Sequence, residues 1–437
     1  MSSKPPTYDE AYVWVWLPGA TEPVVAGRLS ASNGLVHFNY GKSFLERNDA
    51  ISLYLPELPL EPGELPLPDG LTMPSSIRDA APDAWGRRVI LNRTFGVRGS
   101  ELDRFDLSEL GFLLESGSDR IGALDFQRSP TDYEPRSPTN ATLEELMDAA
   151  HRVEQGIPLS PELEQALHHG SSIGGARPKA LIEDGAVKYV AKFSSSSDVH
   201  SVVKAEFIAM RLAALCGIDA APVSLVSASG RDVLLVERFD RVKVKDGWQR
   251  RMMVSALTIF GLDEMMARYA SYIDLAEQVR HRFTDAPATL RELFARITFN
   301  ILCGNTDDHA RNHAAFWDGE LLTLTPAYDI CPQQRAGQEV GQAMRIADTD
   351  NLSRIATCLE VAHHFQLSEP DAVAIVEAQL KGIAANWQAV CEEAQLWQTD
   401  RNRFWGRQFL NPFAFTELKS DHAALATLAE EIRATAN

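Results

Sequence analysis

The sequence has little cysteine and no long apolar run. Its five cysteines, in 437 residues, are scattered and odd in number. None forms a C-x-x-C pair, so the pattern indicates reduced thiols and neither a disulfide framework nor a zinc ribbon. No apolar run approaches the roughly 20 residues that cross a bilayer, and residues 1–10 lack the apolar core of a signal peptide. We therefore expect a cytoplasmic protein.

The sequence also has few basic residues. It contains 42 Lys and Arg but 60 Asp and Glu, which gives a net charge of −18. This charge repels a nucleic-acid backbone, so the chain alone is not expected to bind DNA or RNA freely. One basic stretch, Arg238 to Arg251, could meet phosphates that a partner presents. It also fits an exposed hairpin that turns at Asp246-Gly247. The composition, 45% apolar and 23% charged, is that of a globular protein.

The length predicts two or three domains. The first 60 residues indicate β-structure, with an aromatic and β-branched run at Tyr12–Leu17 and a hairpin turn at Asn33-Gly34. Helices are expected over Ser75–Phe95 and, after a cap at Asp106, over Leu107–Leu114. Arg128–Pro138 holds three prolines in eleven residues and is the best linker candidate.

Beyond this linker the sequence shows a recognisable order of strands and helices. Thr142 and Glu145 begin a helix with a capping-box pattern. A glycine-rich loop at Ser171–Lys179 precedes a strand at Lys188–Phe193, and a helix capped by Asp198 follows over about 199–216. A second strand, Asp232–Val236, runs into Glu237-Arg-Phe-Asp240. Beyond residue 252 the pattern is mostly helical, with breaks at 304–312 and 323–330.

Several of these segments carry residues suited to phosphoryl transfer, which requires positioning and charge neutralisation. Gly174-Gly175 lets a backbone approach an anion closely, although a plain turn fits equally. Lys192 lies in an alternating run much like the V-A-I-K strand of protein kinases. Glu206, fourteen residues later, is placed either to pair with that lysine or as a solvated helix carboxylate near Lys204. Glu237 to Phe239 follow an apolar strand, as a hinge that binds adenine through backbone groups would.

The most specific segment is G-N-T-D-D-H-A-R-N at 304–312. Asp307 and Asn312 have the spacing of Asp and Asn in the kinase catalytic loop H-R-D-x-x-x-x-N. Asp307 could accept the proton of a substrate hydroxyl while Asn312 holds magnesium. Asp329, seventeen residues on, supplies a second metal carboxylate after a short hairpin at Asp318-Gly319.

Other interpretations of the same residues stay open at this point. The D-D-H segment could be a polar turn that caps a helix. Asp307, Asp308, His309 and His313 could bind a transition metal as in a nuclease or hydrolase, although Lys192 and the glycine loop would then have no role. The sequence contains no G-x-S-x-G or Cys/His signature of a nucleophilic hydrolase.

Taken together, the motifs resemble those of the HipA-type serine/threonine kinases, toxin components of bacterial HipBA modules. The carrying motifs are S-S-I-G-G-A-R-P-K-A (171–180), Y-V-A-K-F (189–193), L-L-V-E-R-F-D-R (234–241), G-N-T-D-D-H-A-R-N-H (304–313) and L-T-P-A-Y-D-I (324–330). The N-terminal region is similar to the family's β-rich subdomain at A-G-R-L (26–29), I-S-L-Y-L-P (51–56), F-D-L-S-E-L-G (105–111) and R-I-G-A-L (120–124). The resemblance spans most of the chain, least clearly after residue 345.

The resemblance implies an α+β fold, namely a two-lobed protein-kinase-like fold with an additional β-rich N-terminal subdomain and a mostly helical C-lobe. The corresponding divisions are an N-terminal subdomain (1–135), a kinase N-lobe-like region with glycine-rich loop and hinge (139–240) and a helical C-lobe with the catalytic loop (241–437). It further implies an ATP-dependent serine/threonine protein kinase with ATP and Mg²⁺ as cofactors.

Family roles transfer to matching positions. Asp307 matches the catalytic aspartate, and Asn312 and Asp329 match the magnesium ligands. The residues that match ATP-binding positions are Gly174, Gly175, Ala176, Arg177, Pro178, Lys179, Lys192, Glu237, Arg238, Phe239 and His309. Ser172, or Ser171 beside it, matches a serine whose autophosphorylation ejects the glycine loop and inactivates the kinase.

Two departures from the family pattern occur near these positions. The loop reads G-G-A-R-P-K where some members have A-G-A-Q-E-K, which places a positive charge and a proline beside the phosphates. Asp308 stands where other members have glycine and adds a second carboxylate that could bind metal.

As a family member, the chain would be a growth-arresting toxin, and its target would be a translation component such as an aminoacyl-tRNA synthetase, glutamyl-tRNA synthetase in particular. Its partner would be a HipB-like helix-turn-helix antitoxin, and only the complex would bind operator DNA. Two other functions fit the sequence: an inactive kinase-like corepressor acting with the antitoxin, and a small-molecule kinase similar to lipid or aminoglycoside kinases. The retention of Lys192, Asp307, Asn312 and Asp329 argues against the first of these alternatives.

Overall fold

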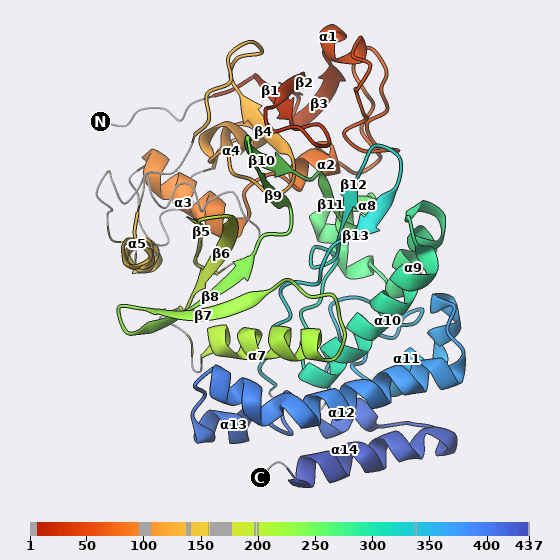
Figure 1. The fold of residues 1–437 in the computed structure, drawn as a ribbon. Helices are drawn as coiled ribbons and strands as arrows, with labels where there is room; N and C mark the ends of the chain where they lie inside the picture. The colour runs from red at the N-terminus through yellow and green to blue at the C-terminus, as the bar shows by residue number, and fades with distance from the viewer. Residues whose placement is uncertain are drawn as a thin grey trace. The chain divides into compact units, whose positions relative to one another are not determined.

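The computed structural model describes residues 7–95, 106–136, 141–155, 157, 177–195, 198, 201–335, 337 and 339–435. The chain forms two compact units, whose elements are labelled in Figure 1. The first unit combines Met1–Ser197 with Val226–Val254 and Phe316–Glu320, and the second comprises Asp198–Leu225, Ser255–Ala315 and Leu321–Asn437. The predicted division at 1–135, 139–240 and 241–437 stays a prediction.

The first unit begins with a four-stranded antiparallel sheet in the order β3-β2-β1-β4. Its strands are β1 (Glu10–Val15), β2 (Val24–Ser32), β3 (Leu35–Tyr40) and β4 (Leu124–Gln127). The hairpin predicted at Asn33-Gly34 is confirmed, since both residues have positive φ, 52° and 78°, as a two-residue β-turn requires. The β-rich start expected from the sequence is therefore present.

Short helices follow this sheet in the first unit: α1 (Lys42–Leu45), α2 (Ser75–Arg78), α3 (Ala84–Phe95) and α4 (Glu109–Glu115). The cap predicted for the last of these is wrong. The Ser108 hydroxyl accepts the hydrogen bond from the Gly111 N–H, whereas Asp106 accepts one from its neighbour Leu107. The helix begins two residues later than predicted because its true cap is a serine, an equally good capping residue.

A second sheet in the order β5-β6-β8-β7 carries the nucleotide-binding residues expected in this unit. Its strands are β5 (Lys179–Asp184), β6 (Val187–Phe193), β8 (Arg231–Glu237) and β7 (Val223–Ala228), and the chain passes between the units in the last of them. Helix α5 (Leu143–Gln155) precedes this sheet. The predicted capping box is confirmed, because the Thr142 N–H donates to Glu145 Oε2 at 2.8 Å and the Glu145 N–H donates to Thr142 Oγ1 at 3.2 Å.

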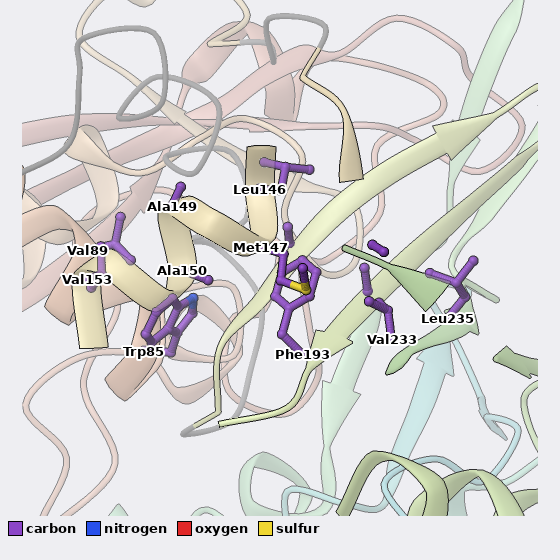
Figure 2. Close-up of a cluster of buried hydrophobic side chains, with 13 residues drawn as sticks. Trp85, Val89, Leu146, Met147, Ala149, Ala150, Val153, Phe193, Val233 and Leu235 are labelled. Atoms are coloured by element: carbon purple, nitrogen blue, oxygen red, sulfur yellow. The ribbon is translucent and has the colours of Figure 1, made fainter. Parts of the chain in front are cut away.

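One face of this sheet forms the apolar core shown in Figure 2. Trp85 and Val89 of α3 and five residues of α5 pack there against Ala191 and Phe193 of β6. The remaining members are Leu146, Met147, Ala149, Ala150, Val153, Ala180, Ala228, Val233 and Leu235. Since side chains alternate along a strand, Lys192 projects from the opposite face of the sheet.

The basic stretch at 238–251 is a hairpin, as the second interpretation of the sequence held. Strands β9 (Arg241–Val244) and β10 (Gly247–Arg250) pair antiparallel across the Asp246-Gly247 turn. The guanidinium groups of Arg238 and Arg241 are buried and paired with acids of the same unit. Two of the cations in this stretch are thus neutralised internally and cannot serve a nucleic acid.

The second unit is mostly helical. Its helices are α7 (Val202–Leu215), α8 (Ala256–Ile259), α9 (Tyr272–Arg282), α10 (Ala286–Cys303), α11 (Ile355–Glu360), α12 (Glu369–Glu393), α13 (Gln398–Phe404) and α14 (Ala423–Thr435), with 3-10 helices η3 (Glu264–Tyr269), η4 (Ala362–Phe365), η5 (Pro412–Phe415) and η6 (Ser420–His422). Short strands β11 (Met253–Ser255), β12 (Ala314–Trp317) and β13 (Leu322–Leu324) lie along the segments where the chain passes between the units.

Helices α7, α10 and α12 form the centre of this unit. The Thr298 hydroxyl of α10 donates to Gln379 Oε1 of α12 at 2.9 Å. A Cβ atom at Gly382 would lie 2.7 Å from Cys216 Sγ, so glycine lets α12 approach the end of α7. The α7 cap predicted at Asp198 is wrong, since the Ser201 hydroxyl accepts from the Lys204 N–H. None of the described helices is long and apolar enough to span a membrane.

Candidate active site

The predicted catalytic loop begins where α10 ends. Gly304 has φ +75°, the left-handed conformation that commonly terminates a helix. A Cβ atom at this position would lie 2.6 Å from the Gln408 carbonyl oxygen, so no other residue fits without displacement. Helix α10 therefore ends at a fixed point, and the next residues leave it in a defined direction.

Asp308 anchors this loop to the core of the second unit. Its Oδ2 accepts hydrogen bonds from the Tyr272 hydroxyl at 2.5 Å, from Asn300 Nδ2 at 2.7 Å and from His313 Nε2 at 3.0 Å. All four residues are buried. Because an ionised carboxylate can only accept, His313 must carry its proton on Nε2. The residue that departs from the family pattern thus holds the loop in place.

The electrostatics of Asp308 agree with this role. Burial alone would raise its pKa, but the adjacent His313 and the hydrogen bonds lower the pKa of Asp308 below its ordinary value of 3.8. The metal-binding role that the sequence left open for Asp308 stays untested, but its enclosed carboxylate already accepts three hydrogen bonds from the surrounding residues. Among the described residues, no group of three or more His, Cys, Asp or Glu is placed to hold a metal ion.

Asp307, the predicted catalytic base, has the opposite environment. Its side chain is exposed, and its N–H donates to Asn305 Oδ1 at 3.3 Å. Partial loss of water raises the pKa of Asp307, His309 lowers it, and the carboxylates of Asp329 and Asp308 raise it further, with a net increase. The effect of Asp329 indicates that these two predicted site residues lie near each other in the second unit.

Asn312 lies beside Asp307. Its Nδ2 donates to the Asp307 carbonyl oxygen at 3.2 Å, and its own N–H donates to the His309 carbonyl at 2.8 Å. This arrangement orients the Asn312 side chain with its amide nitrogen toward the loop, so that its oxygen is the atom suited to a hard cation.

The two residues before Asp329 are held by hydrogen bonds to distant parts of the second unit. The Tyr328 hydroxyl donates to the Arg311 carbonyl at 2.6 Å, and the Ala327 N–H donates to the Asp219 carbonyl at 2.7 Å. Asp329 itself has φ +60°, which aspartate tolerates better than most residues but which is still uncommon. Two carboxylates and an amide oxygen, all hard oxygen donors, fit Mg²⁺ by the chemistry of the donor set.

His309, which is predicted to contact ATP, lies between Asp307 and Asn312 in the sequence, and its side chain is partly buried. Its Nδ1 is buried and makes no hydrogen bond in the part of the chain that the structure describes. An unsatisfied imidazole nitrogen next to Asp307 can serve a ligand oxygen.

The first unit holds the predicted lysines. Lys192 lies in β6, directly opposite Lys179 of β5, so both project from the same face of the sheet. Lys179 is almost fully buried, and its Nζ pairs with Asp83 Oδ2 at 3.2 Å. The ATP-binding roles of both lysines stay predictions, and Lys179 would have to leave its ion pair to contact a phosphate directly.

The predicted adenine hinge, Glu237 to Phe239, follows β8. The Arg238 N–H donates to the Lys188 carbonyl at 2.8 Å, while its guanidinium pairs with Asp119 at 2.9 Å and Asp240 at 2.8 Å. Only the carbonyl oxygen of Arg238 can therefore serve an adenine. The Phe239 ring packs edge-on against Phe316 with centroids 6.0 Å apart.

The predicted lysine partner, Glu206, lies mid-helix in α7 of the second unit and is 3% exposed. This burial excludes the alternative of a solvated helix carboxylate. The nearby Lys204 donates to the Gln395 carbonyl at 3.1 Å. The pairing of Glu206 with Lys192 stays a prediction, because the two residues belong to different units.

The glycine loop lies largely outside the described residues, including Ser171, Ser172, Gly174, Gly175 and Ala176. Of the predicted loop, Arg177, Pro178 and Lys179 are described. The Pro178 carbonyl accepts from the Phe193 N–H at 3.0 Å, so the loop ends against the same strand that carries Lys192.

Sequence reasoning missed Arg335, six residues after Asp329. All three nitrogen atoms of its guanidinium are buried with no hydrogen-bond partner among the described residues. Burial lowers its pKa below the ordinary value of 12.5. The segment is fixed beside the catalytic loop by the Gln333 N–H, which donates to the Gly304 carbonyl at 2.9 Å. A buried guanidinium without a partner among the described residues has the donors and the charge that suit an anionic ligand.

Comparisons with known proteins point to one family. The family model of the HipA-like C-terminal domain matches residues 171–387, and that of the HipA N-terminal domain matches residues 15–127. Among curated proteins, Y4mE of Sinorhizobium fredii, named as a candidate kinase, is 28% identical over 274 residues, which cover 56% of this chain and 64% of that protein. The serine/threonine-protein kinase toxin HipA of Shewanella oneidensis is 27% identical over 184 residues, 36% of this chain and 42% of the relative.

These matches span less than two thirds of the length of either curated relative. A solved structure of Shewanella oneidensis HipA, in complex with HipB and operator DNA, aligns with a TM-score of 0.62 and 19% identity over 97% of this chain and 96% of that one. The predicted α+β, two-lobed kinase-like fold with a β-rich N-terminal region is thus confirmed. The chain belongs to the HipA family of protein-kinase-like proteins.

Proposed function

We propose that this chain is an ATP- and Mg²⁺-dependent serine/threonine protein kinase and acts as the growth-arresting toxin of a toxin–antitoxin module. The observation that carries the proposal is the arrangement in the second unit: Asp307 lies near Asp329 and is hydrogen-bonded to Asn312, on a loop that Asp308 anchors. Phosphoryl transfer needs this set of oxygen ligands and an accepting carboxylate.

In this proposal each residue of the candidate site has one role. Asn312 and Asp329 hold Mg²⁺, which neutralises charge on the nucleotide phosphates when bound. Asp307 accepts the proton of the attacking serine hydroxyl, and its raised pKa brings it closer to that of an effective base. Lys192 and Arg335 supply positive charge to the phosphates, His309 contacts the nucleotide, and the backbone at Glu237 to Phe239 holds the adenine.

The partners follow from the relatives. The similar Shewanella protein is found with HipB and operator DNA, so we propose a HipB-like helix-turn-helix antitoxin for this chain and DNA contact through that complex. The proposed target is a translation component such as an aminoacyl-tRNA synthetase, in the cytoplasm. Autophosphorylation at Ser172, or at Ser171, would add about −1.5 to −2 charges beside the ATP phosphates and oppose nucleotide binding.

A growth and phosphotransfer experiment tests this function. Asp307→Gln is expected to abolish phosphotransfer and growth inhibition while the protein still folds and binds ATP. Phosphoproteomics after pulsed expression of the active and the substituted protein would identify the target. Ser172→Ala should remove the phosphate, which is about 80 Da beyond the mass change of the substitution itself; a phosphate that remains points to Ser171, and its absence from the wild-type protein means that neither site is used. Full toxicity of Asp307→Gln would overturn the kinase proposal.

The corepressor alternative makes a different prediction in the same experiment. A kinase-like module that acts only with an antitoxin would repress its operator equally well with Asp307 or Gln at this position. A small-molecule kinase would transfer phosphate without labelling any protein. Both outcomes are separable from the toxin kinase by the phosphoproteome alone.

A further inference from the structure

An apolar patch stands out on the surface of the second unit. Met265 is 82% exposed, Tyr269 45% and Met266 43%, and all three lie in the 3-10 helix η3, which contains no buried residue. Single exposed apolar side chains are ordinary, but here three of them lie within five residues of one short helix. Methionine side chains are flexible and polarizable and adapt to varied apolar partners. We call Met265, Met266 and Tyr269 the Met265 patch.

The patch is attached directly to the catalytic loop. Glu264, the first residue of η3, pairs through Oε1 with Arg311 Nη2 at 2.5 Å. Arg311 immediately precedes the predicted magnesium ligand Asn312 and is bound through its carbonyl by Tyr328, the neighbour of Asp329. The ion pair therefore places η3 next to the residues proposed to perform the chemistry.

The segments on both sides of η3 hold the same loop. Before it, the Ala256 N–H donates to the His313 carbonyl at 2.7 Å and the Leu257 N–H to the Ala310 carbonyl at 3.2 Å. After it, the Tyr272 hydroxyl donates to Asp308 at 2.5 Å. The chain from 256 to 272 thus contacts the catalytic loop before, within and after the Met265 patch.

The helix η3 is also fixed internally. The Asp263 side chain accepts from the Met265 N–H at 2.9 Å, and its carbonyl accepts from the Met266 N–H at 3.0 Å. At the other end, the Arg345 guanidinium donates to the Tyr269 carbonyl. The apolar side chains are therefore displayed from a backbone that is held in place, which reduces the entropic cost of binding.

The charged residues around the Met265 patch are of both signs. Asp263 and Glu264 are acidic, and Arg268, Arg311 and Arg345 are basic. Two of these charges, Glu264 and Arg311, neutralise each other in an ion pair, so the exposed apolar side chains are the feature of this surface that a docking segment would contact. An extended polypeptide advances only about 3.3 Å per residue, so residues near the acceptor can reach η3.

From these contacts we infer that the Met265 patch binds apolar residues of the polypeptide substrate, a few positions from the hydroxyl that receives the phosphoryl group. The inference rests on the proposed kinase function and adds a substrate class to it: a serine-containing segment with an apolar residue beside it. Met265 would act in substrate docking and not in the chemical step.

A degenerate peptide library with a central serine, incubated with the full-length protein and Mg-ATP, tests this inference. The wild-type protein is expected to select Leu, Met or Phe at one position near the serine. Met265→Ser should raise KM for a selected peptide about tenfold with little change in kcat, as expected when one buried methionine contact is lost. Trp397→Ser is the matched control, since Trp397 is 76% exposed in the same unit but outside this segment.

The outcomes separate the inference from the function beneath it. If the wild-type protein transfers phosphate to peptides without apolar selection, or if Met265→Ser and Trp397→Ser behave alike, the docking inference is overturned and the kinase proposal stands. If the wild-type protein phosphorylates neither itself nor any peptide, both fall. If Met265→Ser changes the sedimentation coefficient and leaves peptide KM unchanged, the patch binds a second copy of the chain instead, and the inference is again wrong.

Discussion

The buried hydroxyl of Tyr272 donates a 2.5 Å hydrogen bond to Asp308, and this contact ties the start of α9 to the catalytic loop. Burial and the nearby carboxylate raise the pKa of Tyr272 well above its ordinary value of 10.0, so its hydroxyl stays a hydrogen-bond donor.

We predict that Asp308→Ala lowers the free energy of unfolding by about 3–5 kcal/mol, because the buried donors of Tyr272, Asn300 and His313 then lose their acceptor. Tyr272→Phe should cost about 1–3 kcal/mol by leaving the carboxylate one donor short. Urea titration measures both.

The pH dependence of this effect has a definite sign. Since the pKa of Asp308 in the folded protein is below 3.8, its contribution to stability is present above that value and is lost as the pH falls through the folded pKa. The difference in unfolding free energy between wild type and Asp308→Asn should therefore shrink as the solution is acidified below about pH 4. A constant difference would contradict the assignment of an ionised, anchoring carboxylate.

The stability contribution of Asp307 should depend on pH in the opposite direction to that of Asp308. Its pKa is raised in the folded protein, so the folded state holds the proton more tightly than the unfolded chain does and loses stability as the pH rises above 3.8. Asp307→Asn should therefore become more stable relative to wild type as the pH rises above about 4. Adding Mg²⁺ with ATP should raise the Tm of both proteins, because Asn312 and Asp329 remain in the variant to hold the metal.

Asp307 and Asp308 serve as controls for each other. Asp307 and Asp308 are sequence neighbours with the same side chain, yet one is exposed and the other buried. If Asp307→Asn proved as destabilising as Asp308→Ala, the assignment of one residue to chemistry and the other to structure would be wrong.

Local patterns identified much of this site before the structure did. The spacing of Asp307, Asn312 and Asp329 depends on short-range chain geometry, and the structure brings these residues near one another in one unit. Strand alternation likewise identified β6, because its apolar residues face one core. The caps at Asp106 and Asp198 were misassigned because a serine two or three residues later was an equally good acceptor.

Partners distant in sequence could not be predicted in this way. The bonds to Asp308 come from Tyr272, 36 residues away, and from Asn300 on another element. Arg335 gives no sequence signal at all, since only its burial distinguishes it from a surface arginine. A single sequence without relatives aligned to it contains no information about such tertiary contacts.

Arg335 yields a prediction in which stability and binding change in opposite directions. The Arg335 guanidinium is buried and has no partner among the described residues, so replacing it with an apolar side chain removes a desolvation penalty, and Arg335→Met should stabilise the free protein by about 1 kcal/mol. The same variant should bind Mg-ATP about tenfold more weakly, because a charge-assisted contact to phosphate is lost. Arg335→Lys should show intermediate binding, because it keeps the charge but not the planar fork. Loss of stability without loss of affinity would exclude a phosphate-binding role.

The first unit contains its own buried ion cluster, centred on Asp119. Its Oδ1 lies 2.9 Å from both Arg238 and Arg241, and its Oδ2 lies 2.7 Å from Lys188. These cations hold the pKa of Asp119 well below its ordinary value of 3.8 despite its burial. The cluster joins the segment after α4 to β6, β8 and β9, and hence to the predicted adenine hinge, through contacts that bridge more than a hundred residues of chain.

Removing Asp119 should therefore destabilise the first unit as a whole. Asp119→Ala leaves three cations without their shared acid, and we expect a loss of about 3–5 kcal/mol. Hydrogen exchange should accelerate in peptides from β6 and β8, while peptides from α10 and α12 of the second unit should be unaffected. Asp49→Ala is the matched control, because Asp49 pairs with Arg47 on the surface of the same unit and should show no measurable change. Equal effects of the two substitutions would mean that the cluster contributes no more than a surface ion pair. A loss confined to Asp119→Ala, together with weaker ATP binding, would show that the hinge geometry depends on an acid more than a hundred residues away.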